Sequence, residues 1–122
     1  MIAIAVDDEA LMLGALVASI EASPDITEVT KFSNCNEALD FAKENPIDVA
    51  FLDINMRGIN GIALAEKITA LHPDCKIVFI VDENSEKKSA TQVKQAKKDG
   101  LIDQFIYSSI SASYLSDIVD SL

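Results

Sequence analysis

Residues 48–71, DVAFLDINMRGINGIALAEKITAL, join a short apolar run to a pattern typical of an amphipathic helix. Residues 49–52 form the run, and Leu64, Ile68 and Leu71 then recur at the i, i+4, i+7 spacing of one helix face. A short, continuous apolar run is what a strand buried on both of its faces requires. The segment therefore predicts a strand followed by a helix.

The same unit recurs along the chain on both sides of this segment. Residues 2–6 (IAIAV) and 77–81 (IVFIV) are apolar runs of the same kind, and residues 28–32 and 101–106 predict weaker strands. A helix with its own apolar stripe is expected after the first strand, formed by Leu13, Leu16, Val17 and Ile20.

Helix boundaries are marked by residues that start or stop helices. Asn34 with Glu37 three positions later suits a helix N-terminus, whereas Pro46, Pro73 and Gly100 stand where helices should end. Strict alternation of strand and helix predicts an α/β fold, (βα)5, with a doubly wound parallel sheet. The natural choice is the five-stranded flavodoxin-like order 2-1-3-4-5, with residues 1–122 as one domain.

Composition limits the function. A net charge of −10 argues against direct nucleic acid binding, which relies on Lys and Arg, and favours cations or basic partners. No apolar run approaches the roughly 20 residues of a membrane span, so a cytoplasmic protein is expected. Cys35 and Cys75 lack the spacing of a zinc site and are expected to be reduced, buried thiols. His72, before Pro73, is expected to be an exposed helix-end residue.

Three aspartates follow the first and third strands. In the predicted order these strands are neighbours, so Asp7, Asp8 and Asp53 should meet at the carboxyl edge where such sheets bind ligands. Their mutual repulsion must be offset by protonation with raised pKa values or by a hard divalent cation such as magnesium. Two alternatives remain: Asp8 caps the following helix, or the acids form a rim without a ligand.

Half of the ten basic residues lie within twelve positions. They are Lys87, Lys88, Lys94, Lys97 and Lys98. The segment predicts an exposed helix, which is either a solvated face or a docking surface for a partner.

Three segments resemble the landmarks of response-regulator receiver domains. These are AVDDEALM at 5–12, DVAFLDINMRGINGIALAEKI at 48–68 and GLIDQFIYS at 100–108, and the resemblance covers the whole chain. The middle segment is the most specific, because an apolar strand ending in Asp, a loop with Gly58 and a helix opened by Asn60-Gly61 is a receiver hallmark. Its sequence is also similar to that of receivers that precede LytTR-type DNA-binding domains.

The resemblance implies a function in two-component phosphorelay signalling. Asp53 would accept a phosphoryl group from a sensor histidine kinase and pass the signal to an output domain or partner. Asp8, Asp53 and the backbone carbonyl of Asn55 would ligate Mg2+, and Asp7 would act through a water. A homodimer through the fourth helix, fifth strand and fifth helix is also implied, and the chain would not itself be an enzyme.

Several positions depart from the family pattern, and two of them are positions whose side chains normally bind the phosphoryl group. Val81 stands where the family has Thr or Ser, and Tyr107 where it has a lysine that pairs with the phosphate. Either Lys87 or Lys88 supplies the lost positive charge, or the chain is a degenerate receiver that acts only as an interaction or dimerisation module. A third alternative is an aspartyl-phosphate phosphatase, which shares an Asp-x-Asn sequence after a strand.

Overall fold

The computed structural model describes residues 1–54, 61–81, 94–107 and 112–122. Strands and helices alternate along the chain as the sequence predicts, and residues 94–98 are also helical. The strands are β1 (Ile2–Val6), β2 (Glu28–Phe32), β3 (Val49–Asp53), β4 (Lys76–Val81) and β5 (Gln104–Tyr107). The labelled helices are α1 (Ala10–Glu21), α2 (Cys35–Glu44), α3 (Gly61–Leu71) and α5 (Ala112–Ser121).

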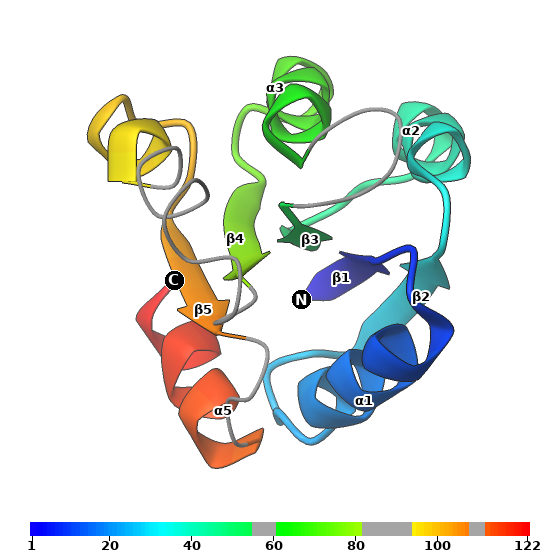
Figure 1. Ribbon diagram of the computed structural model, residues 1–122, viewed down its shortest axis with the longest axis vertical. Coiled ribbons are helices and arrows are strands. Elements are labelled where there is room, and N and C mark those ends of the chain that lie inside the picture. The colour runs from blue at the N-terminus through cyan, green and yellow to red at the C-terminus, as the bar shows by residue number, and fades with distance from the viewer. Residues whose placement is uncertain (55–60, 82–93, 108–111) are drawn as a thin grey trace.

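All five strands are parallel and lie in the order β2-β1-β3-β4-β5. The predicted order is therefore confirmed. Figure 1 shows α2 and α3 on one face of the sheet and α1 and α5 on the other. Because every connection returns the chain to the same starting edge, the carboxyl ends of all strands lie at one edge of the sheet.

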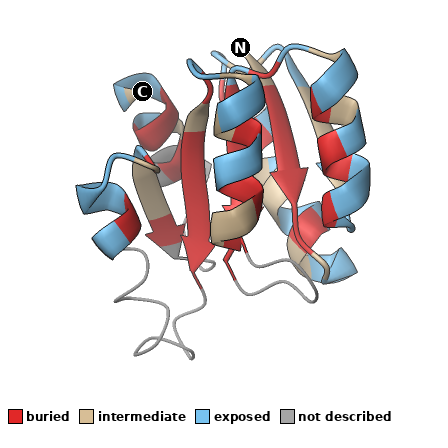
Figure 2. Cartoon of the chain, turned by 90° about the horizontal axis from the view of Figure 1, so that it is seen from above, coloured by how far each residue is buried: buried red, intermediate tan, exposed pale blue. Residues whose placement is uncertain are grey.

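The sheet divides the apolar interior into two cores. Successive residues of a strand point to opposite faces, so β3 gives Leu52 to the core beneath α2 and α3 and Phe51 to the core beneath α1 and α5. Both side chains are fully buried, and Figure 2 shows the buried strands between helices with exposed outer surfaces. The continuous apolar runs in the sequence are thus explained by burial on both faces.

Two predicted helix boundaries are formed by specific hydrogen bonds. The Asn34 side chain accepts from the N–H groups of Asn36 and Glu37 and caps α2. At the end of helix 94–98, Gly100 has a φ of 78° and donates to the Lys97 carbonyl. Left-handed backbone at this position suits glycine, and it ends the helix as predicted.

The fifth strand begins later than predicted. The sequence pattern placed it at residues 101–106, but the structure has it at Gln104–Tyr107. Leu101 donates to the Ala96 carbonyl and completes the helix end, so it is not available to the sheet. Leu71 also differs from expectation, because it is 42% exposed rather than part of the buried stripe with Leu64 and Ile68.

His72 was predicted from the sequence to be exposed, and this prediction is wrong. Its side chain is partly buried, and Nε2 lies 2.6 Å from the Ala42 carbonyl oxygen of α2. Since a carbonyl only accepts, Nε2 carries the hydrogen, and this bond ties the ends of α2 and α3 together.

Cys35 and Cys75 are buried free thiols, which confirms the prediction. Within the described ranges, no helix combines the length and apolar character needed to cross a bilayer.

Candidate functional site

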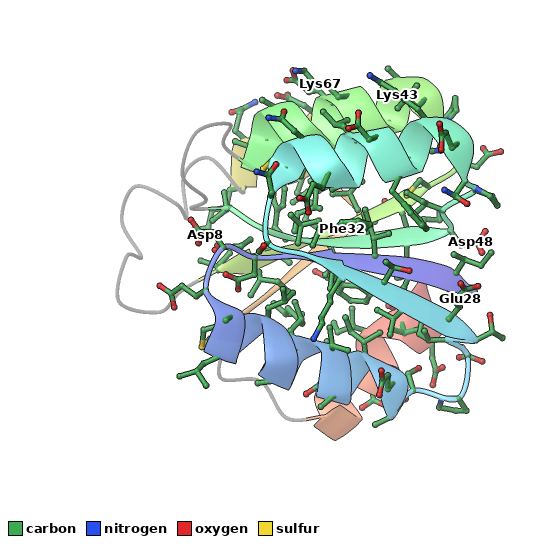
Figure 3. The ribbon with its side chains drawn as sticks, turned by 90° about the vertical axis from the view of Figure 1, so that its right-hand side faces the viewer. Asp8, Glu28, Phe32, Lys43, Asp48 and Lys67 are labelled. Atoms are coloured by element: carbon green, nitrogen blue, oxygen red, sulfur yellow. The ribbon has the colours of Figure 1, made fainter. Side chains whose placement is uncertain are left out.

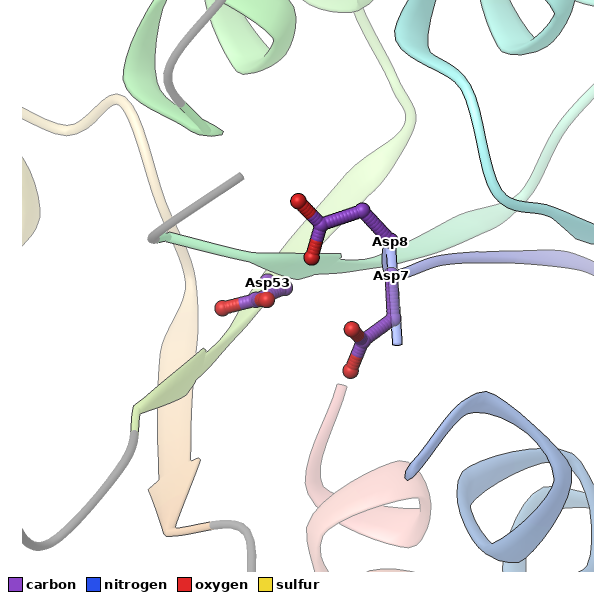
Figure 4. A group of neighbouring side chains, drawn as sticks. All are labelled: Asp7, Asp8 and Asp53. Carbon is purple, nitrogen blue, oxygen red and sulfur yellow. The ribbon is translucent and has the colours of Figure 1, made fainter. Parts of the chain in front are cut away.

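Three carboxylates meet at the carboxyl edge of the sheet (Figure 4). Asp7 and Asp8 follow β1 directly, and Asp53 is the last residue of β3. β1 and β3 are paired in register, with Val6 opposite Leu52, which brings the three residues together. One oxygen atom of each carboxylate lies within 4.8 Å of the other two. The predicted convergence of the three acids is therefore present.

Asp7 is the most enclosed member of this acidic cluster. Its residue is only 5% exposed, whereas Asp8 and Asp53 are partly buried. Burial raises the pKa of Asp7 to about 6, although the hydrogen bond from the Glu9 N–H opposes this, and Asp53 and Asp8 raise it further. The Asp7 side chain also shares a hydrogen bond with Asp53. Without a cation, Asp7 thus binds a proton more readily than an isolated carboxyl group does, and that proton reduces the repulsion below about pH 6.

Backbone hydrogen bonds fix the position of Asp7 in the cluster. Asp7 donates its N–H to the Phe32 carbonyl at 3.1 Å, and its Oδ1 accepts from the Glu9 N–H at 2.9 Å. Glu9, rather than Asp8, is the N-cap residue of α1. The alternative in which Asp8 serves as that helix cap is therefore not supported, and its carboxylate belongs to the cluster.

Cys35 lies close to the cluster, and this position was not predicted from the sequence. Burial raises the pKa of its thiol, and the negative charges of Asp8 and Asp53 raise it further. Cys35 is the first residue of α2 and follows the carboxyl end of β2, the strand beside β1. Its position after a strand end was the available signal, but thiols are so often simple core residues that the signal was weak.

The other predicted site residues are described in part. Val81 is the last residue of β4 and is 2% exposed, and its backbone pairs with that of Tyr107 at the end of β5. Both positions therefore lie at the same edge as the acidic cluster. Asn55, Lys87 and Lys88 lie outside the described residues.

The lysines of helix 94–98 are exposed. Lys94, Lys97 and Lys98 all face solvent, which confirms the exposed basic helix for residues 94–98, the part of the predicted segment that the structure describes. Lys97 donates to the Gln104 side chain at 3.3 Å, and its Nζ lies 5.9 Å from the centre of the Phe105 ring. A docking role for these lysines stays a prediction.

The acidic cluster suits a hard divalent cation. Magnesium prefers oxygen ligands and typically binds one or two carboxylates while it keeps several waters. Two oxygen ligands of one magnesium ion lie at most about 4.2 Å apart, since each Mg–O distance is about 2.1 Å. The carboxylate oxygens of the cluster lie within 4.8 Å of one another, so small side-chain movements bring two of them to one ion. A cation would also compete with the proton that the raised pKa of Asp7 favours, so the residues present fit the ion.

The chain belongs to the response regulator receiver domain family, whose model matches residues 3–107. It is thus a receiver domain of the type found in two-component response regulators. The match includes the five strands, apart from Ile2 at the start of β1, and the three aspartates of the cluster.

Similar proteins agree with this family. The nitrate/nitrite response regulator protein NarL of Escherichia coli is 29% identical over 90 residues, which are 74% of this chain and 42% of that protein. A protein-glutamate methylesterase/protein-glutamine glutaminase of Rhodospirillum centenum is 32% identical over 74 residues, which are 61% of this chain and 19% of that protein. The chain therefore matches less than half the length of either relative.

A solved structure shows the same fold. The response regulator protein TrrA from Thermotoga maritima, in complex with Mg(2+)-BeF, superimposes with a TM-score of 0.77 at 22% identity. The alignment covers 98% of this chain and 96% of that one. The flavodoxin-like receiver fold is therefore confirmed by structure as well as by sequence.

Proposed function

We propose that residues 1–122 form a single cytoplasmic receiver domain that accepts a phosphoryl group on Asp53 from a sensor histidine kinase. The observation that carries this proposal is the meeting of Asp7, Asp8 and Asp53 within 4.8 Å at the switch point of the sheet. Three crowded carboxylates cost free energy unless a cation or a proton offsets them. Such a cost is expected at a functional site and has no evident use in a purely structural one.

Each member of the acidic cluster has a distinct role in the proposal. A carboxylate oxygen of Asp53 attacks the phosphorus of a phosphohistidine, the P–O bond forms, and the P–N bond to the imidazole breaks. Asp8 and Asp53, with the backbone carbonyl of Asn55, would ligate Mg2+ directly, and Asp7 would hold a water of the ion. When bound, the ion supplies the positive charge that neutralises the transferring phosphoryl oxygens.

The described contacts of Asp7 support its role as an outer ligand. Asp7 is almost fully buried, and the Glu9 N–H fixes one of its carboxylate oxygens. A carboxylate held in this way is pre-organised to accept a hydrogen bond from a water at a constant position.

The residues at positions 81 and 107 change which side chains can bind the phosphoryl group once Asp53 is phosphorylated. Val81 has no hydroxyl with which to bind a phosphoryl oxygen, and Tyr107 carries no positive charge. We propose that Lys87 or Lys88 supplies the charge that pairs with the new anion. The intact acidic cluster favours phosphoryl transfer over a function limited to protein interaction.

The proposed partners follow from the same function. They are a sensor histidine kinase and an output domain or protein, and a second copy of the chain that would pair through helix 94–98, β5 and α5. The exposed Lys94, Lys97 and Lys98 would form part of that surface. Direct nucleic acid binding is not part of the proposal, and neither is enzymatic turnover beyond phosphoryl uptake and loss.

Incubation with acetyl phosphate and Mg2+ tests the proposal. Intact-mass spectrometry should show one added phosphoryl group, and peptide mapping should locate it at Asp53. Asp53→Asn should show no gain, and EDTA should prevent the gain in the unaltered protein. A gain that persists in Asp53→Asn, or no gain at all, would contradict a role as phosphoacceptor.

A further inference from the structure

Gly61 packs directly against the backbone of the proposed phosphoacceptor. It is the first residue of α3 and is buried, and its N–H donates to the Ile54 carbonyl at 3.3 Å. A Cβ atom at this position would lie 2.7 Å from the Asp53 carbonyl oxygen and 2.8 Å from the Ile54 Cα. Ordinary carbon contacts are about 3.5 Å, so a methyl group does not fit without movement.

The space around Asp53 is closed on its other side. The Ile54 N–H donates to the Ile80 carbonyl of β4 at 3.2 Å, and Asp53 is paired with Ile80 in the sheet. The Ile54 side chain is 2% exposed and belongs to the core beneath α2 and α3. The end of β3 is thus held between β4 and the start of α3.

We propose that Gly61 is a positioning residue for Asp53, which sets the distance between its carboxylate and those of Asp7 and Asp8. This inference rests on the proposed function. The φ of Gly61 is not positive, so glycine is required here for close approach rather than for an unusual backbone conformation. A methyl group would move the start of α3, the end of β3, or both by several tenths of an ångström.

A displacement of this size matters for magnesium in particular. Magnesium demands near-ideal octahedral geometry at 2.0–2.1 Å, whereas calcium accepts irregular arrangements at 2.3–2.6 Å. A small shift of Asp53 should therefore weaken magnesium binding more than calcium binding. General destabilisation of the domain would weaken both ions to the same extent.

Isothermal titration of Gly61→Ala with Mg2+ and with Ca2+ tests the inference. We expect Mg2+ affinity to fall about 10-fold or more, as for other residues that support ligands, and Ca2+ affinity to fall by a smaller factor. The matched control is Gly14→Ala in α1, where an added Cβ meets no atom within 4 Å. This control should bind both ions as the unaltered protein does.

Each outcome decides the question. Folded Gly61→Ala with unchanged Mg2+ affinity, or with equal losses for both ions, would overturn the positioning role. If the variant does not fold, the double variant Gly14→Ala/Gly61→Ala is titrated in trimethylamine N-oxide, which strengthens folding. Failure of that double variant to fold would assign Gly61 to fold support and also overturn the inference. Unaltered protein that binds no Mg2+ contradicts the proposed function itself, which separates the two failures.

Discussion

The two edges of the sheet both carry aspartates, but the surroundings of these aspartates differ. At the amino edge, Asp48 accepts the Ile2 N–H at 2.7 Å. Asp103 there accepts the Ile77 N–H at 3.0 Å and lies 3.8 Å from the Lys76 Nζ. Figure 3 places Asp48 at the end of the molecule opposite Asp8. Asp48 and Asp103 are therefore matched with donors.

At the carboxyl edge, the aspartates instead face one another. Asp7, Asp8 and Asp53 lie together at this edge, and burial together with the neighbouring carboxylates raises the pKa of Asp7 to about 6. The comparison teaches that residue type alone does not separate structural from functional acids. What separates the two groups is the neighbouring side chains: Asp48 and Asp103 lie beside nitrogen donors, whereas the three acids of the cluster lie beside one another.

The largest expected effect is on the pH dependence of the metal-free protein. Folding raises the pKa of Asp7 from 3.8 to about 6, so the folded state holds this proton more tightly than the unfolded chain. The free energy of unfolding should therefore decrease as pH rises from about 4 to above 6, by up to about 3 kcal/mol from this group. Urea unfolding in EDTA at several pH values measures it. Asp7→Asn should flatten the curve, and an unchanged curve in that variant would contradict the assignment.

The second-largest effect is expected for Asp8→Asn, which tests whether the acids at the two edges of the sheet have different roles. Because Asp8 is a proposed direct ligand, its loss should lower Mg2+ affinity by at least the roughly 10- to 100-fold found when supporting residues are lost. The same substitution should raise the stability of the metal-free protein, because it removes one of the like charges of the acidic cluster. Titration calorimetry and thermal unfolding measure the two effects. A variant that is less stable without metal would mean that Asp8 is a structural acid like those of the amino edge.

Asp48→Ala should lower stability and leave Mg2+ affinity unchanged, which is the opposite of Asp8→Asn, and its effect should be smaller. It removes the acceptor of the Ile2 N–H, so we expect a loss of about 1 kcal/mol in stability. Mg2+ affinity should stay unchanged, since the residue lies at the far edge of the sheet. A change in Mg2+ affinity with intact folding would show that the two edges are coupled.

Lys76→Met should have the smallest effect. Its ion pair with Asp103 is 3.8 Å long, and the two side chains are 44% and 37% exposed. Exposed pairs contribute about 0–1 kcal/mol and are screened by salt, so a loss of about 0.5 kcal/mol or less is expected. Thermal unfolding at low and high salt checks this. A loss that does not diminish with salt would point to packing of the lysine chain instead.

The architecture and the acidic cluster were accessible from sequence for one reason. Apolar runs such as residues 2–6 and 49–52 require burial on both faces, and this requirement with strict alternation leaves few sheet orders. Once the order is known, acids directly after the first and third strands must be neighbours. Asp7, Asp8 and Asp53 follow from topology, so no distance between side chains was needed to predict their meeting.

Contacts that depend on three-dimensional packing were not accessible. His72 was predicted to be exposed, yet it reaches the Ala42 carbonyl of a helix 30 residues away in sequence. The approach of Cys35 to the acids and of Gly61 to Asp53 depends on how helices sit on the sheet, which local patterns do not encode. The start of β5 was misplaced because the helix end uses Leu101.

The division of the interior by β3 has a consequence for how the molecule comes apart. Phe51 and Leu52 are adjacent in sequence and anchor opposite cores, so neither core melts while the other keeps its central strand. Denaturation should be a single cooperative transition, with calorimetric and van't Hoff enthalpies that agree. Since β3 ends in Asp53, a cation bound there would stabilise the strand that both cores share and would raise the single melting temperature.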